Sequence, residues 1–353
     1  MMHSTCMLPV ERPIITSWAN QAHIFSIAQR HPAFKSWLCS KYIQLELIQG
    51  WSGRDVVLNY THIASPEEEC PWLEISSTTL SKILEAGDLI SFYKQALSKG
   101  TYIYQLLNQY YIPYYPYYQK MDDLHDPMII GFDDSREVFF LADFHRNPDE
   151  ATRYGVFEVT YRELEDAVCK LPAHLNRMGC IELWRYKPDV SWEFDLETAI
   201  QSLTDYLQST YTPHREPTWL TTTVLEYGMK TYDHLLHVLE ESKSDREMGD
   251  FRFFHVLSDH KQLMLLRLQY MNEAGLISQA AFDAYQELLQ ETSVIRNLLL
   301  KFGLSRRMSL LDRIILLLRS LAEGEQRILS TILCELKDRK DSLRIQTLPI
   351  QAG

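Results

Sequence analysis

Residues 110–144 read YYIPYYPYYQKMDDLHDPMIIGFDDSREVFFLADF. Two short apolar runs, 126–132 and 137–144, flank a polar stretch of four residues, a pattern typical of a β-hairpin. With the turn centred near Asp134 and Ser135, His125 lies opposite Asp143 or one step away. Directly opposed residues place their Cβ atoms ~5 Å apart on the same face. The spacing therefore predicts that the Asp143 carboxylate holds the His125 imidazole.

The composition limits what the protein can be. A chain of 353 residues is long enough for two domains. Its formal net charge of −12 argues against nucleic acid or an anionic membrane as the main partner, because both would repel it. No apolar run approaches the ~18 residues of a membrane span, and the N-terminus does not resemble a secretory signal. The six cysteines form no CxxC pair. These features predict a reduced, cytoplasmic protein.

The chain before residue 192 is first helical and then mainly β. Helices are expected over about 17–30 and 32–47, and strands over 55–64, 101–109 and 180–186, besides the hairpin. Thr160 and Glu163 form a T-x-x-E capping box, which predicts a helix that begins at Tyr161 and runs to about Lys170. The pattern predicts an α+β domain with an antiparallel sheet over residues 1–192.

The chain after residue 192 shows helical periodicity throughout. Five segments show apolar residues at intervals of three and four, and Gly, Pro or Ser residues punctuate them. This pattern predicts an all-α domain of four or five helices over residues 193–344. A frayed tail is expected over residues 345–353.

The chemistry suggested by the hairpin is proton transfer. A histidine held by an aspartate is the orienting half of a nucleophile, base and carboxylate arrangement. His125 is the candidate general base, and Asp143 would fix its tautomer and stabilise the imidazolium. The alternative is a hairpin whose polar ends simply lie in water. Asp122, Asp123 and Asp126 lack a second histidine at metal-ligand spacing, so a solvated acidic turn is favoured over a metal site.

Tyrosines are concentrated just before His125, with eight between Tyr102 and Tyr118. Their rings favour burial and their hydroxyls need partners. Tyr110, Tyr111 and Tyr114 are therefore candidates for the wall of a substrate-binding site beside His125. The alternative is core packing, which is the usual role of aromatic residues.

Four segments in order carry a resemblance to a known family: NQYYIPYYPYY, LHDPMIIGFDD, FFLADF and VTYRELEDAV. Over about residues 14–190 the chain resembles the N-terminal domain of butirosin biosynthesis protein H and its relatives in antibiotic gene clusters. The resemblance implies a papain-like fold related to bacteriocin-processing cysteine peptidases. It also implies acyl or aminoacyl transfer from a carrier-protein thioester to an amine, through a cysteine acyl-enzyme. The family's histidine and aspartate fall on His125 and Asp143.

The resemblance further implies the partners. They are an acyl or peptidyl carrier protein and a small-molecule amine or peptide acceptor, in non-ribosomal peptide or polyketide natural-product biosynthesis. Neither a metal nor an organic cofactor is required.

The sequence departs from this family at the nucleophile. The family's cysteine lies at the start of the first buried helix, where this chain has Trp18, Ala19 and Asn20. Three explanations remain open. Ser17 could attack, aided by the helix N-terminus. Alternatively, Cys6 or Cys39 could reach the site.

The third explanation is that covalent catalysis has been lost. The leading hypothesis is a thioester-dependent acyltransferase in which His125 acts as general base and Asp143 orients it. The alternative is a catalytically inactive papain-like protein that binds or scaffolds a carrier protein or peptide in the same kind of pathway. A peptidase is disfavoured, because a thiol protease requires a placed cysteine.

Overall fold

The computed structural model describes residues 4–49, 56–61, 70–146, 151–172, 180–211, 224–245 and 252–347. The chain divides into two compact units. Unit 1 comprises residues 1–32 and 66–191, and unit 2 comprises residues 33–65 and 192–353. The sequence predicted a single boundary at residue 192. Residues 33–65 instead group with the C-terminal part of the chain.

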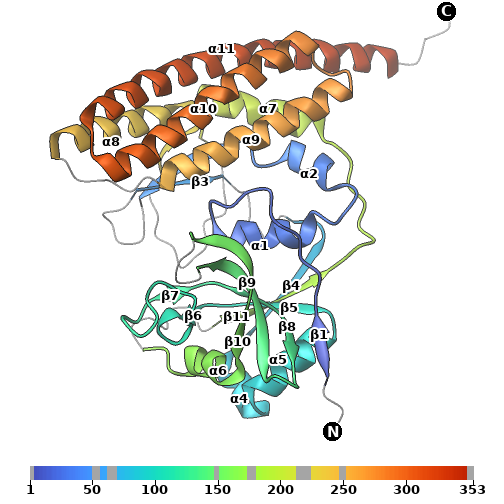
Figure 1. Cartoon of the computed structure of the whole chain (residues 1–353). Helices are drawn as coiled ribbons and strands as arrows, with labels where there is room; N and C mark the ends of the chain where they lie inside the picture. Colours follow the sequence, from blue (N-terminus) through green and yellow to red (C-terminus); the bar gives the residue numbers. More distant parts are fainter. Residues whose placement is uncertain are drawn as a thin grey trace, which may run out of the picture. The chain divides into compact units, whose positions relative to one another are not determined.

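A seven-stranded antiparallel sheet forms the centre of unit 1 (Figure 1). Its strand order is β10-β9-β8-β5-β11-β4, and β1 pairs with the part of β8 that β5 leaves free. The strands are β1 Thr5–Met7, β4 Leu73–Thr79, β5 Thr101–Tyr104, β8 Met128–Asp133, β9 Val138–His145, β10 Arg153–Thr160 and β11 Cys180–Tyr186. The predicted mixture of helices with an antiparallel sheet is confirmed.

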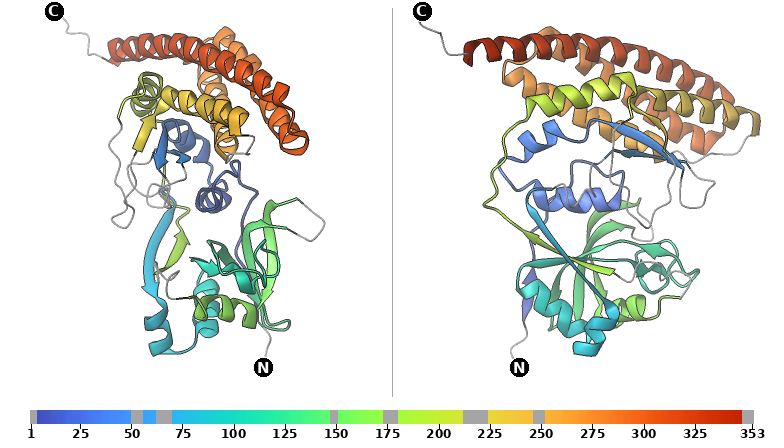
Figure 2. Two further views of the ribbon diagram at one scale, coloured as in Figure 1. Left: turned by 90° about the vertical axis from the view of Figure 1, so that its left-hand side faces the viewer. Right: turned by 180° about the vertical axis from the view of Figure 1, so that it is seen from behind.

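Unit 1 contains four helices among its described residues: α1 Ala19–Ala28, α4 Leu80–Ala86, α5 Leu89–Ser98 and α6 Tyr161–Cys169. Side chains of α4, α5 and α6 share one apolar core with the sheet, which includes Tyr93, Leu164 and Phe139. The predicted capping box of α6 is confirmed, because Thr160 and Glu163 each accept a hydrogen bond from the other's backbone N–H. Helix α1 lies apart from these three helices (Figures 1 and 2).

Strands β8 and β9 form the predicted hairpin, but with a different register. Met128 faces Ala142, one or two residues further along β9 than the sequence predicted. The turn takes up four residues and ends with Glu137 in the left-handed conformation at φ 51°. A bulge between Ile129 and Gly131 shifts the register again.

His125 is not part of this hairpin. It belongs to β7 (Leu124–His125), which pairs with β6 (Leu107–Asn108), followed by the 3₁₀ helix η1 (Gln109–Tyr111). The predicted opposition of His125 and Asp143 across a ladder was therefore wrong.

Unit 2 combines helices with a small sheet. Its helices are α2 Phe34–Ser40, α7 Leu196–Gln208, α8 Thr231–Asp245, α9 Arg252–Glu273, α10 Gln279–Ser305 and α11 Met308–Thr347. The longer helices run beside one another (Figure 2). The sheet has the order β12-β2-β3, with β2 Leu45–Gln49, β3 Val56–Tyr60 and β12 Val224–Tyr227. The 3₁₀ helix η2 Gly228–Lys230 follows β12.

The prediction that residues 193–344 are entirely helical was wrong at β12. This strand pairs with β2, a segment that the sequence assigned in part to a helix. The chain turns directly after β12 at Gly228, where φ is 50° and a Cβ would overlap the carbonyl oxygen of Tyr206. Only glycine fits such a position without strain. Because β12 and β2 lie far apart in the chain, this small sheet depends on long-range contacts.

One buried carboxylate links five helices of unit 2. Glu325 of α11 accepts hydrogen bonds from Lys261 of α9 at 2.6 and 2.7 Å and from Tyr285 of α10 at 2.8 Å. The hydroxyls of Tyr206 on α7 and Tyr232 on α8 donate to the same carboxylate at 2.9 and 2.8 Å. All five side chains are buried. Each of these helices is thus tied to one point.

The longest described helix, α11, has 40 residues and continues to Thr347, into the predicted tail. Residues 348–353 lie outside the described part of the chain. Within the described ranges, no helix is both long enough and apolar enough to cross a membrane.

Candidate active site

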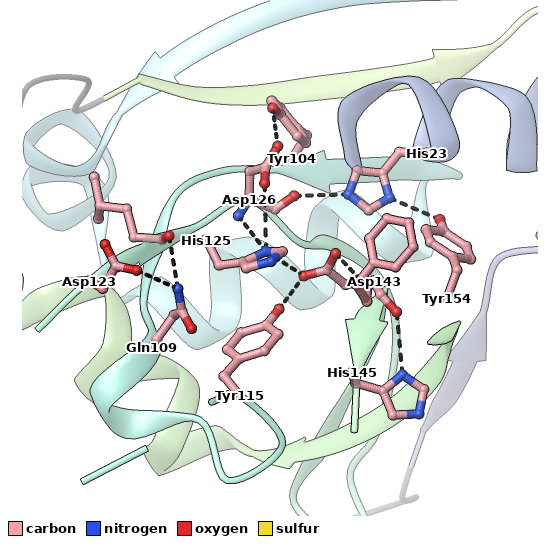
Figure 3. Close-up of polar contacts among 12 residues, drawn as sticks. His23, Tyr104, Gln109, Tyr115, Asp123, His125, Asp126, Asp143, His145 and Tyr154 are labelled. Carbon is pink, nitrogen blue, oxygen red and sulfur yellow. Dashed lines mark hydrogen bonds and ion pairs between the residues drawn. The ribbon is translucent and has the colours of Figure 1, made fainter. Parts of the chain in front are cut away.

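The side chains of His125 and Asp143 are in contact, as the sequence predicted (Figure 3). Nδ1 of His125 lies 2.8 Å from Oδ2 of Asp143. A carboxylate only accepts hydrogen bonds, so Nδ1 carries a proton and donates. The polar contacts of His125 with the described residues are all made through Nδ1, and its side chain is 25% exposed. Nε2 is therefore the nitrogen that can meet a substrate.

Asp143 is completely buried and fully engaged. Its Oδ1 accepts the backbone N–H of Phe144 at 2.6 Å, and its Oδ2 accepts both His125 and the hydroxyl of Tyr115. Burial alone would raise the pKa of Asp143, but the charge and hydrogen bond of His125 outweigh it and lower that pKa. Asp143 thus remains a carboxylate at neutral pH.

The same pairing acts on His125. Burial alone would lower the pKa of His125, but the charge and hydrogen bond of Asp143 outweigh it and raise the pKa to about 9. At neutral pH the imidazole is mostly protonated, and the neutral form grows about tenfold per pH unit until the pKa is reached. A base with this pKa works best in mildly alkaline solution.

Tyr115 is the tyrosine that the structure brings to His125. Their rings stack with centroids 4.7 Å apart and an interplanar angle of 16°. Because the Tyr115 hydroxyl also donates to Asp143, one side chain both supports the imidazole and hydrogen-bonds its carboxylate partner. Tyr115 belongs to the tyrosine cluster seen in the sequence, but it was not among the candidates for the wall of the substrate-binding site.

The three tyrosines that the sequence selected make other contacts. The rings of Tyr110 and Tyr111 meet edge to face, with centroids 5.0 Å apart. The ring of Tyr114 packs on Phe157 at 5.2 Å. These contacts neither place the three rings in a substrate site nor exclude them from one. Their role in substrate binding stays a prediction.

The aspartates around His125 are more engaged than a solvated turn would be. Asn108 donates to Asp122 at 2.8 Å, and Gln109 donates to Asp123 at 2.9 Å. Asp126 accepts the hydroxyl of Tyr104 at 2.9 Å. In the described part of the chain, no group of three histidine, cysteine, aspartate or glutamate residues could hold a metal ion.

A second histidine, His23, lies beside this site and was missed by the sequence analysis. It is fully buried in α1, and its Nε2 lies 2.8 Å from the carbonyl oxygen of Asp126. Its Nδ1 lies 2.9 Å from the hydroxyl of Tyr154. A usable signal was present, because Gln21, His23 and Ser26 are polar residues among the apolar residues of α1.

None of the predicted nucleophiles hydrogen-bonds to His125. Ser17 precedes α1, and its Oγ has no hydrogen-bond partner among the described residues. Cys6 lies in β1, where its Sγ is 3.5 Å from the carbonyl oxygen of Leu97 and burial raises its pKa. Cys39 lies in α2 of unit 2, where burial raises its pKa to about 11. Both thiols are mostly protonated at neutral pH.

Comparison with known proteins finds no matching family model and no matching curated protein. The side-chain geometry is therefore the basis for assigning chemistry. A histidine–aspartate pair with one open imidazole nitrogen can accept and return a proton at Nε2. Every residue of this pair and its supports comes from unit 1.

Proposed function

We propose that the chain is a thioester-dependent acyltransferase in which His125 acts as general base and Asp143 orients it. The acyl donor would be a carrier-protein thioester and the acceptor a small amine or peptide, in non-ribosomal peptide or polyketide biosynthesis. Within this proposal unit 1 is papain-like and related to the butirosin biosynthesis protein H family. The resemblance of residues 14–190 supports that relationship.

One observation carries the proposal. Nδ1 of His125 donates to the buried Asp143 carboxylate at 2.8 Å, while Nε2 has no partner among the described residues. A structural histidine would use both nitrogens within the fold, as His23 does. An imidazole anchored on one side and open on the other is the arrangement that a general base needs.

The proposed step is direct transfer. The acceptor amine attacks the thioester carbonyl carbon, forming a C–N bond while the C–S bond breaks. The amine proton passes to Nε2 of His125, and the imidazolium then returns a proton to the leaving thiolate. Asp143 stabilises the imidazolium between these two transfers. This route forms no acyl-enzyme, because the acceptor amine attacks the thioester directly.

A second candidate function is binding without catalysis, as a scaffold for a carrier protein or peptide. The observation in its favour is the missing nucleophile, because no serine or cysteine side chain of the described residues hydrogen-bonds to His125. In both cases we place the protein in the cytoplasm. All six cysteines lie in the described part and are unpaired, which fits a reducing compartment.

Turnover of small thioesters tests the proposal. Wild type and His125→Ala would be given N-acetylcysteamine thioesters of several acyl and aminoacyl groups, with glycinamide as acceptor. The released thiol would be measured with a colorimetric thiol reagent. Loss of a positioned general base costs about 10²–10⁴-fold, so we expect a loss of that size in His125→Ala. His237→Ala, which removes a side chain that is 64% exposed on α8, is the matched control and should keep the wild-type rate.

Equal rates for wild type and His125→Ala would refute the proposal. If neither accelerates thiol release while a phosphopantetheinylated carrier protein still binds, the scaffold function is supported instead. Intact-mass measurement during turnover separates the two chemical routes. We expect no added acyl mass on the protein.

A further inference from the structure

We propose that His23 is a positioning residue for His125. Through its hydrogen bond to the Asp126 carbonyl, it holds the segment that carries His125 against Asp143. This role deepens the proposed function and rests on it only in treating His125 as the base. The contact itself can be tested without substrate.

The segment needs an anchor because it lies between two pairings. Strand β7 ends at His125 and β8 begins at Met128, so Asp126 and Pro127 belong to neither ladder. Pro127 has no N–H to donate, and it restricts the preceding residue to extended backbone. The Asp126 carbonyl therefore needs a partner outside the sheets, and His23 supplies it at 2.8 Å.

His23 is fixed in the form that this bond requires. A carbonyl only accepts, so Nε2 of His23 carries the proton and Nδ1 accepts the hydroxyl of Tyr154 at 2.9 Å. The ring is completely buried, and burial lowers its pKa. His23 is thus neutral at neutral pH. Its backbone belongs to α1, a helix of 10 residues.

The hold on Asp126 reaches His125 directly. Asp126 directly follows His125, whose Nδ1 donates to Asp143 at 2.8 Å. The Asp126 carboxylate lies 3.6 Å from the same nitrogen and is itself held by the Tyr104 hydroxyl. Movement of Asp126 would therefore move the imidazole relative to a carboxylate that β9 keeps in place. Figure 3 shows the series of contacts that runs from His23 through Asp126 and His125 to Asp143.

Two near-isosteric variants separate the hydrogen bond from packing. The amide N–H of His23→Gln can reach the position of Nε2 and donate to the Asp126 carbonyl. The side chain of His23→Asn is one methylene shorter and places its amide near the position of Nδ1. Ile27→Val is the matched control, because Ile27 is completely buried in α1 and apolar.

The readout is the pKa of His125 in the free protein, measured by side-chain NMR of ¹⁵N-labelled histidine. We expect His125 to titrate at about 9 in wild type and to keep that value in His23→Gln and Ile27→Val. In His23→Asn we expect its pKa to fall by about one unit or more towards the ordinary ~6.5. Tyr154→Phe, which removes the hydroxyl that fixes the His23 ring, should change it in the same direction. This variant decides the matter if His23→Asn does not fold.

An unchanged His125 pKa in both His23→Asn and Tyr154→Phe would overturn the inference. An equal fall in His23→Gln and His23→Asn would also overturn it, because packing and not the hydrogen bond would then be responsible. The proposed function fails separately. Suppose that the protein turns over no thioester, but that the pKa of His125 falls in His23→Asn and not in His23→Gln. The acyltransferase proposal is then refuted, while the positioning role of His23 is supported.

Discussion

Asp143 determines the charge state of the candidate site. It is a completely buried carboxylate that accepts a backbone N–H, a tyrosine hydroxyl and the imidazole of His125. Such a group is stable only while its donors remain in place, since an unpaired buried charge is costly. The pair should therefore make folding stability depend on pH.

The sign follows from the raised pKa of His125. Its pKa of about 9 in the folded protein, against ~6.5 unfolded, corresponds to a stabilisation on the order of 3 kcal/mol. That stabilisation is fully present below about pH 6.5 and is lost as the pH rises through about 9. In Asp143→Asn it should be absent. We expect the wild-type unfolding free energy to fall over this range by a few kcal/mol more than that of Asp143→Asn.

Urea unfolding at pH 6 and pH 9, followed by near-UV circular dichroism, measures this difference. Comparing the two proteins cancels the contributions of other titrating groups. Parallel curves for wild type and Asp143→Asn would show that the pair contributes no stability through its charge.

The sequence located His125 and Asp143 but not their supports. Both stand at the ends of apolar runs, where a polar residue is conspicuous. Tyr115 is one of eight similar residues, and the direction of each ring depends on turn geometry that spacing does not encode. His23 contacts Tyr154 and Asp126, which are more than 100 residues away in the chain. Such long-range contacts leave only an indirect signal, the polar residues within α1.

The hairpin shows how an element can be predicted while its register is not. Two apolar runs separated by a polar stretch identified β8 and β9, but register depends on turn length and on bulges. Here the turn has four residues, with Glu137 in the left-handed conformation, and a bulge precedes Gly131. His125 still reaches Asp143 because the chain leaves the ladder at Pro127. The capping box of α6 was predictable because all its hydrogen bonds are local.

Gly131 is where β8 comes closest to β1. A Cβ at this position would overlap the carbonyl oxygen of Cys6, which is backbone and cannot move aside as a side chain could. We therefore expect Gly131→Ala to lower the unfolding free energy by about 1–3 kcal/mol. Gly87→Ala is the control, since no other group lies within 4 Å of the added carbon. A near-neutral Gly131→Ala in urea unfolding would contradict this packing of β1.

Each compact unit of the molecule is built from two separate stretches of the chain, whereas the sequence suggested one boundary. Residues 33–65 belong with the C-terminal helices because β2 pairs with β12, more than 170 residues later. Helical periodicity in residues 193–344 correctly indicated long helices. It could not reveal a four-residue strand whose partner lies so far away.

Glu325 is the residue on which the helices of unit 2 converge. Removing one partner of a buried ion pair leaves the other charge uncompensated, which costs about 3–5 kcal/mol. We expect Glu325→Ala to destabilise by that amount, because Lys261 and three tyrosine hydroxyls lose their acceptor. Glu323→Ala, an exposed position on the same helix, should change stability by no more than about 0.5 kcal/mol. If Glu325→Ala and Glu323→Ala lowered the unfolding free energy equally, the Glu325 carboxylate would not stabilise the helices of unit 2 in this way.

The pH dependence of thioester turnover most directly tests whether the His125–Asp143 pair is a working base. The substrate would be an N-acetylcysteamine thioester with an aromatic amine as acceptor, which stays unprotonated over the range used. We expect kcat/KM of wild type to rise about tenfold per pH unit and to level off near pH 9. In Asp143→Asn the curve should level off at lower pH and at a lower rate. A wild-type rate that is independent of pH between 6 and 9, or no turnover at any pH, would contradict the proposed role of His125.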